Sequence, residues 1–147
     1  MPFFTDDYFM DLAIREAKAA AEEGEIPVGA ILVSGNQILA KTHNQTELLH
    51  DVTAHAEILA ITAGSEFLGS KYLPDCTLYV TLEPCPMCAG ALRWAQLGRL
   101  VYAAADEKNG YMNFGSEMLH PKTSVAFGVR MDICGNLMTE FFREKRN

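Results

Sequence analysis

Four side chains in two short segments have the types and spacing of a metal-dependent catalytic site. Cys85 and Cys88 are three residues apart, so in the first turn of a helix both sulfurs would lie on one side. The positive end of such a helix favours thiolate over thiol. His55 could supply a third ligand to a zinc ion. Three protein ligands with an open position for water are typical of catalytic zinc, whereas structural zinc is usually closed by a fourth side chain.

Glu57 follows His55 by two residues and turns the metal site into a reaction hypothesis. Zinc lowers the pKa of bound water from about 15.7 to about 7. A carboxylate beside the metal that is not itself a ligand could then move protons as general base and general acid. Alone, Glu57 would be interpreted as compensating a helix dipole, and a lone Cys-x-x-Cys as redox-active or structural. The combination favours catalytic zinc.

Composition predicts one globular domain spanning residues 1–147. The chain is 49% hydrophobic and 21% charged, which is ordinary for a globular protein. It contains no apolar run of the roughly 20 residues that a membrane span needs and no basic segment of a signal peptide at its start, so we expect a cytoplasmic location and no membrane partner. In the reducing cytoplasm, four cysteines with one close pair indicate a metal site or a catalytic site more than disulfide bonds. Cys76 and Cys134 lack metal-site spacing and are predicted to be small buried residues.

The net charge of -7 argues against a nucleic-acid partner, because Lys and Arg normally dominate phosphate binding. Net charge is an average, however. Arg143, Lys145 and Arg146 are close together near the end of the chain and leave a local positive surface open. The alternative interpretation is a solvated charged terminus.

Hydrophobic periodicity predicts alternating helices and strands. Thr5 is a candidate N-cap and Gly24 a candidate C-cap of the first helix. The second helix should begin near His55, with Thr53 as a possible cap, and end at Gly64. A third should run from the cysteine motif through Trp94, and the last should follow residues 135–136. Strands are expected at residues 28–33, 37–41, 76–82, 99–103 and 125–129, with a long loop over residues 106–122.

This order of elements predicts an α/β fold. Strands joined through helices need crossover connections, which place helices on the faces of the sheet. We therefore expect a three-layer α/β/α sandwich with a central mixed sheet of about five strands.

The pairing of His55-Ala-Glu57 with Pro84-Cys-Pro-Met-Cys88 resembles the zinc-dependent cytidine deaminase superfamily. Residues 51–57, 81–85, 88–91 and 98–102 are similar, more narrowly, to the bacterial tRNA-specific adenosine deaminases, and the similarity covers about residues 7–143. It implies a cytidine deaminase-like fold, one Zn²⁺ per chain, a homodimer, and conversion of the wobble adenosine of a tRNA anticodon to inosine.

The resemblance also implies roles for individual residues. His55, Cys85 and Cys88 would bind zinc, and Glu57 would be the catalytic proton carrier. Substrate contacts would come from the Asn44 side chain, from the backbone at Ala56, and from Asp106 near the bound anticodon loop, while the end of the last helix, around residues 141–143, would help to hold RNA.

Several positions differ from the bacterial tRNA deaminases. They are Val52, Ala105 and residues 111–114. Pro86 and the Trp94–Ala95 pair look like guanine deaminases of the same superfamily. The alternative is therefore a free nucleobase or nucleoside deaminase acting on guanine, cytosine or a related compound. A noncatalytic zinc module that binds RNA is a third hypothesis, against which the intact Glu57 argues.

Aromatic residues receive two interpretations. Trp94, Phe141 and Phe142 are predicted to be packing residues. Tyr111 and Phe114, in the polar loop, are the better candidates to touch a base.

Overall fold

The computed structural model describes residues 4–146, in which five strands form one mixed sheet of order β2-β1-β3-β4-β5. β1 is antiparallel to β2 and β3, whereas β3, β4 and β5 are parallel. The elements are α1 (Asp6–Glu22), β1 (Gly29–Ser34), β2 (Gln37–His43), α2 (Ala56–Leu68), β3 (Cys76–Leu82), α3 (Pro86–Trp94), β4 (Arg99–Ala104), the 3₁₀ turns η1 (Tyr111–Asn113) and η2 (Ser116–Met118), β5 (Ser124–Phe127) and α4 (Met131–Arg146). The predicted α/β class with a five-stranded mixed sheet is confirmed.

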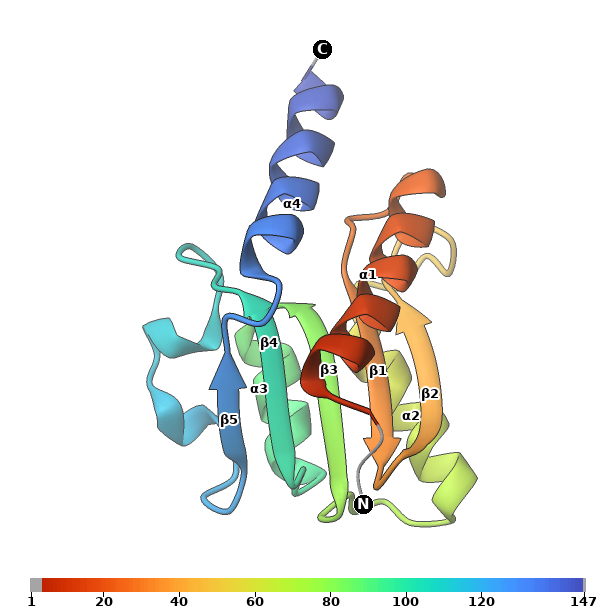
Figure 1. Cartoon of the computed structure of the whole chain (residues 1–147), viewed down its shortest axis with the longest axis vertical. Coiled ribbons are helices and arrows are strands. Elements are labelled where there is room, and N and C mark those ends of the chain that lie inside the picture. The colour runs from red at the N-terminus through yellow and green to blue at the C-terminus, as the bar shows by residue number, and fades with distance from the viewer. Residues whose placement is uncertain (1–3, 147) are drawn as a thin grey trace.

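Helices cover both faces of the sheet (Figure 1): α1 and the start of α4 lie on one face, and α2 and α3 on the other. Side chains alternate between the two faces along each strand. Leu32 and Leu78 pack in the core beneath α2 and α3, whereas their neighbours Ile31 and Tyr79 pack beneath α1. Apolar side chains on both faces of the sheet therefore hold the helices against it. This packing fixes where the ends of the strands lie relative to the first turns of the helices.

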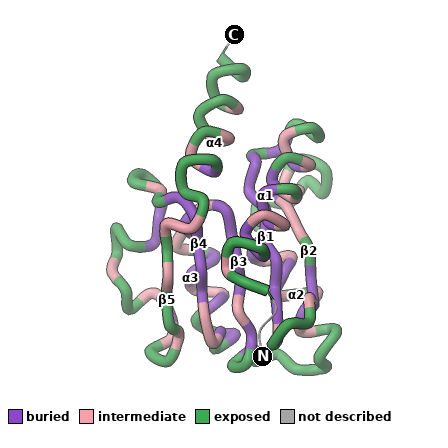
Figure 2. The backbone as a smooth tube through the Cα atoms, in the orientation of Figure 1, coloured by how far each residue is buried: buried purple, intermediate pink, exposed green. Residues whose placement is uncertain are grey.

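The far part of α4 extends beyond the sheet and is exposed (Figures 1 and 2). Cys134 is the one buried residue of α4, and Arg143, Lys145 and Arg146 lie in the last turn. Within residues 4–146, no helix combines the length and apolar character that a membrane crossing requires.

Two predicted helix boundaries are wrong, because each lies at a glycine that the structure places inside a helix. α2 continues through Gly64 and ends at Leu68, with Gly69 as its C-cap in the left-handed region at a φ of 66°. Gly64 serves close packing instead, because a Cβ there would collide with Leu32 Cδ2. Likewise, α4 begins at Met131, so residues 135–136 lie inside the helix.

Other local predictions are also corrected. Thr53 does not cap α2, because its hydroxyl donates a hydrogen bond to Asp51 Oδ1, and His55 occupies the N-cap position. The loop over residues 106–122 contains η1 and η2. Trp94 is 82% exposed, so it is not a packing residue within this chain. Cys76 and Cys134 are buried, as predicted.

His43, the last residue of β2, connects the sheet to α1 through two carboxylates. Its Nδ1 lies 2.9 Å from Glu16 Oε1 and its Nε2 lies 2.7 Å from Glu23 Oε2. Burial opposes protonation of His43, but the hydrogen bonds to Glu16 and Glu23 outweigh it and raise the pKa of the imidazole.

The raised pKa makes the contribution of His43 to stability depend on pH. It is fully present below the unfolded-state pKa near 6.5 and is lost as pH rises through the folded-state value. We expect His43→Gln to lower the Tm by about 2–4 °C at pH 6, corresponding to about 1 kcal/mol, and by less at pH 9. Thermal unfolding at both pH values checks this, with the exposed His50→Asn as control. Equal losses at the two pH values would contradict it.

Candidate metal centre and its cavity

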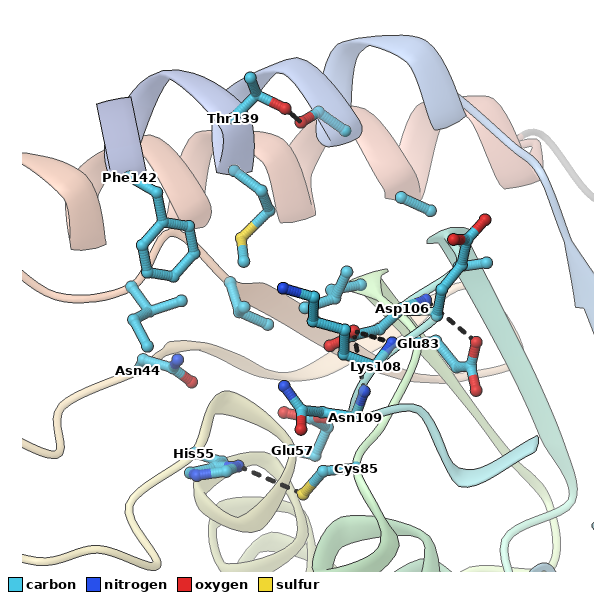
Figure 3. A pocket seen from close by; sticks show the side chains of 18 of the residues that line it. Asn44, His55, Glu57, Glu83, Cys85, Asp106, Lys108, Asn109, Thr139 and Phe142 are labelled. Atoms are coloured by element: carbon cyan, nitrogen blue, oxygen red, sulfur yellow. Dashed lines mark hydrogen bonds between the residues drawn. The ribbon is translucent and has the colours of Figure 1, made fainter. Parts of the chain in front are cut away.

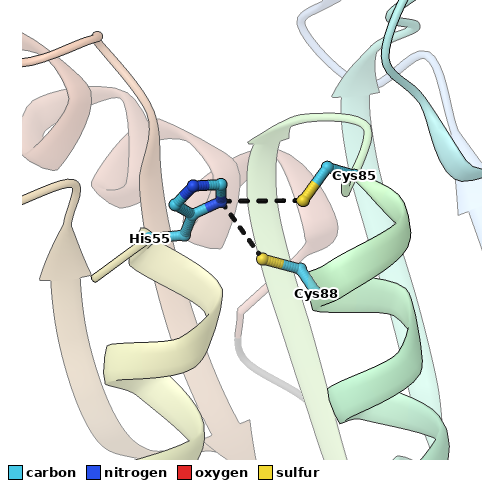
Figure 4. A group of neighbouring side chains, drawn as sticks. All are labelled: His55, Cys85 and Cys88. Atoms are coloured by element: carbon cyan, nitrogen blue, oxygen red, sulfur yellow. Dashed lines mark hydrogen bonds between the residues drawn. The ribbon is translucent and has the colours of Figure 1, made fainter. Parts of the chain in front are cut away.

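Two helix N-termini bring three potential metal ligands together (Figure 4). β3 ends at Leu82 and leads into Cys85, the N-cap of α3, and Cys88 lies in the first turn of that helix. His55 is the N-cap of α2. Pro86 at the first helical position of α3 suits this start, because its fixed φ is helical and a first-turn N–H would have no helical partner. The side chains predicted to share a metal therefore converge from separate parts of the sequence.

The donor atoms have the separation that a tetrahedral metal ion requires. Bonds of about 2.3 Å to sulfur and about 2.0 Å to nitrogen, at tetrahedral angles, place nitrogen and sulfur about 3.5 Å apart. His55 Nδ1 lies 3.7 Å from Cys85 Sγ and 3.4 Å from Cys88 Sγ. All three donor atoms lie within 4.8 Å of one another. The residues fit a zinc site with three protein ligands.

The environment of the thiols favours a thiolate at the centre. The hydrogen bonds from Cys88 and His55 lower the pKa of Cys85 to about 4, although burial opposes this. The hydrogen bond to Cys85, together with burial, raises the pKa of Cys88. The hydrogen bond to Cys85 also raises the pKa of His55. Thiolate character at this position suits metal binding, because cysteine binds a metal ion as thiolate and releases its proton on binding.

Glu57 lies in the first turn of α2 and is 4% exposed. Burial raises the pKa of its carboxyl to about 7, although the backbone N–H and the nearby His55 act in the opposite direction. A carboxyl with this pKa can both accept and donate a proton near neutral pH. It is absent from the three-ligand group, as a proton carrier beside the metal should be.

A cavity of about 1260 Å³ opens above these residues. Figure 3 shows His55, Glu57 and Cys85 at its base, the loop with Asp106, Lys108 and Asn109 along one side, and α4 across the top. From α4 the lining includes Met138, Thr139, Phe142, Lys145 and Arg146. The cavity therefore joins the metal centre to the basic end of the last helix.

Asn44 and Ala56 are connected by a buried hydrogen bond. The Ala56 N–H donates to Asn44 Oδ1 at 2.8 Å, and the Ala56 carbonyl accepts from the Thr42 hydroxyl at 2.7 Å. Because its oxygen is engaged at the start of α2, Asn44 presents its NH₂ group as the donor available to a ligand. Asn44 lines the cavity, and the substrate contacts assigned to Asn44 and Ala56 remain predictions.

Asp106 also lines the cavity, but its carboxylate serves its own loop. Oδ1 accepts hydrogen bonds from the Lys108 and Asn109 N–H groups at 3.2 and 3.0 Å. Asp106 thus shapes the turn that carries these two residues. Its predicted contact with substrate remains a prediction.

Two buried carboxylates were missed from the sequence. Glu25 accepts hydrogen bonds from the backbone N–H groups of Glu47 and Leu48, and Glu83 accepts them from Asp106 and Met112. Each holds a loop beside the cavity. Their signal in the sequence was slight, because the partners of each carboxylate lie more than twenty residues away.

The two aromatic candidates for base contact differ in their exposure. Tyr111 is 1% exposed and packs edge-on against Tyr102, so the prediction that it touches a base is wrong. Phe114 is 72% exposed and lines the cavity. It remains available to a ligand.

Comparison with known proteins gives a consistent picture. The family described as MafB19-like deaminase matches residues 4–146. A tRNA-specific adenosine deaminase of Agrobacterium fabrum is 43% identical over 144 residues, covering 95% of each chain. A solved structure from biochemical and structural studies of A-to-I editing by tRNA:A34 deaminases is 42% identical and superposes with a TM-score of 0.83, covering 88% of this chain and 97% of that one.

A guanine deaminase structure is also similar. The enzyme from Bacillus subtilis is 38% identical with a TM-score of 0.67, over 69% of this chain and 66% of that one. The likeness to it covers less of both chains than the likeness to the tRNA:A34 deaminase structure.

Proposed function

This chain belongs to the MafB19-like deaminase family, and from that premise we propose that it is a zinc-dependent enzyme converting the wobble adenosine of a tRNA anticodon to inosine. The observation that carries the proposal is the buried Glu57 beside the three donors His55, Cys85 and Cys88 at the base of an open cavity. The similarity to tRNA-specific adenosine deaminases over nearly the whole chain supports the substrate.

The side chains at the base of the cavity have separate roles in the hydrolysis, namely zinc binding and proton transfer. When bound by His55, Cys85 and Cys88, one zinc ion would supply a Lewis acid that makes a water molecule nucleophilic near neutral pH. Glu57 accepts a proton as the water oxygen bonds to C6 of adenine. It delivers this proton to N1 of the ring, then takes the remaining proton of the added hydroxyl group and delivers it to the amine, so that the C6–N bond breaks, ammonia leaves and C6 becomes a carbonyl. The NH₂ group of Asn44 helps to orient the base.

Basic residues at the cavity support an RNA partner despite the acidic composition. Lys108, Lys145 and Arg146 all line the cavity that contains Glu57. Carboxylates, including Asp106 and Glu107, line the same cavity, so these three cations are the groups that would contact phosphates flanking a splayed nucleotide. A tRNA partner also implies a cytoplasmic location.

A homodimer forms part of the same proposal. Val52, Trp94 and Phe114 are 84%, 82% and 72% exposed, so each is accessible to another chain. A second copy of this chain is the partner that the resemblance implies.

An ammonia-release panel tests the substrate. Anticodon stem-loops with adenosine at the wobble position should release ammonia and yield inosine, whereas free guanine, cytosine, adenosine and cytidine should react far more slowly. The matched control is the same stem-loop with guanosine at that position. Rapid turnover of guanine with none of RNA would establish the free-base alternative instead.

A further inference from the structure

The loop over residues 106–112 forms one wall of the cavity and is held by a carboxylate that is not a metal ligand. Glu83 follows β3 and is 5% exposed. Its Oε1 accepts a hydrogen bond from the Asp106 N–H at 3.1 Å, and its Oε2 accepts one from the Met112 N–H at 3.0 Å. One side chain therefore fixes both ends of the loop. Burying a carboxylate is unfavourable unless such donors compensate it.

The backbone of this loop also packs directly on Glu83. A Cβ at Gly110 would collide with Glu83 Oε2. The neighbouring Tyr111 N–H donates to the Pro84 carbonyl at 2.9 Å. The loop is thus attached to the same short segment that leads into Cys85, so its position is tied to that of the metal centre.

Two further side chains hold the loop internally. Asp106 Oδ1 accepts from the Lys108 and Asn109 N–H groups. The Asn113 side chain donates to the Glu107 and Lys108 carbonyls at 3.0 and 3.2 Å. With Glu83, these contacts define the backbone of residues 106–109 before any ligand binds.

The Glu107, Lys108 and Asn109 side chains all line the cavity, and none of the three has a hydrogen-bond or ion-pair partner among residues 4–146. Lys108 and Asn109 are the two suited to RNA, because the Glu107 carboxylate repels phosphate. Figure 3 shows both side chains extending from the loop into the cavity, with Asn109 on the side of Glu57. A rigid backbone therefore presents an ammonium and a carboxamide that are free to contact a ligand.

We propose that Glu83 is a positioning residue, which through the 106–112 loop holds Lys108 and Asn109 against the RNA nucleotide entering the cavity. The Lys108 ammonium suits a phosphate, because it is a compact point charge. The Asn109 carboxamide has both donors and an acceptor for the edge of a base. This role rests on the proposed function, since it takes RNA as the substrate.

Glu83→Gln is the first test. The Gln side chain keeps the shape, but its NH₂ group would face one of the two backbone N–H donors instead of accepting from it. We expect kcat/KM for the anticodon stem-loop to fall about ten- to hundredfold, mainly through KM, with one zinc retained per chain. Amide hydrogen exchange should accelerate in residues 105–114 and not in α2 or α3. The exposed Glu22→Gln should match wild type.

A double-mutant cycle separates positioning from general destabilisation. If Glu83 acts through the side chains that the loop presents, Asn109→Ala should lower kcat/KM by a smaller factor in the Glu83→Gln background than in wild type. Asn136→Ala, an exposed amide that does not line the cavity, is the control for Asn109. If the fold-losses in kcat/KM of Glu83→Gln and Asn109→Ala simply multiply in the double variant, the positioning role of Glu83 is overturned.

Asn113→Ala is the second route if Glu83→Gln does not fold. It removes two hydrogen bonds of the same loop from an exposed position and should also raise KM for the stem-loop. Wild-type turnover is measured first, because its absence on RNA would contradict the proposed function itself. Turnover by wild type with unchanged kcat/KM in both Glu83→Gln and Asn113→Ala would overturn only the role of Glu83.

Discussion

Replacing Glu57 with Gln should lower turnover by roughly 10²–10⁴-fold while leaving the fold and the metal content unchanged. Gln has nearly the same shape as Glu, so the first turn of α2 and the 4% exposure of the site should be preserved. What is lost is the carboxyl whose pKa is raised to about 7 by burial. No other group at the base of the cavity combines this pKa with a position outside the three-ligand set.

Single-turnover kinetics with a saturating stem-loop, together with zinc analysis of the same sample, measures this effect. Glu66→Gln is the matched control, because Glu66 lies on α2 as well but is exposed. Wild-type turnover by a zinc-loaded Glu57→Gln enzyme would show that the proton carrier has been misassigned.

Replacing Cys88 with Ala should remove zinc and abolish activity together. Cys88 is fully buried at the centre, and two remaining ligands cannot provide the usual set of three. Because a ligand that binds only the folded state stabilises it, we expect a chelator to lower the Tm of wild type and to leave the Tm of Cys88→Ala unchanged. Adding zinc back to the chelated wild type should restore its Tm and its activity.

Cys134→Ala is the comparison for this loss, since Cys134 is also buried but lies on α4, outside the three-ligand group. It should keep one zinc per chain, as measured by atomic absorption, whatever packing it loses. A Cys88→Ala protein that still held one zinc per chain would rule out the three-ligand centre described above.

Short-range patterns predicted the base of the cavity. Cys85 and Cys88 lie in one helical turn, and His55 and Glu57 are two residues apart, so each pair is positioned by the start of a single helix. The strand over residues 76–82 was predicted with its observed bounds, because an alternating, β-branched segment is recognisable without its neighbours. Local information sufficed for these parts.

The contacts that hold the walls of the cavity join distant residues and were not predicted, although Asn44 and Asp106, which line those walls, were named from the resemblance. Glu83 holds Met112, 29 residues later in the chain, and no periodicity marks such a partner. Gly64 fits against Leu32 of β1, so a residue that usually ends a helix lies within one. Trp94 fits the apolar pattern of α3 yet is 82% exposed, because none of residues 4–146 covers it.

Running the reaction of the adenosine stem-loop in H₂¹⁸O tests the central claim most directly. If Glu57 and the metal centre act on water, mass spectrometry of the digested RNA should find inosine carrying one ¹⁸O at C6, formed in proportion to the ammonia released. The account would be contradicted if the zinc-loaded enzyme left the adenosine unchanged, or if the inosine formed carried no ¹⁸O.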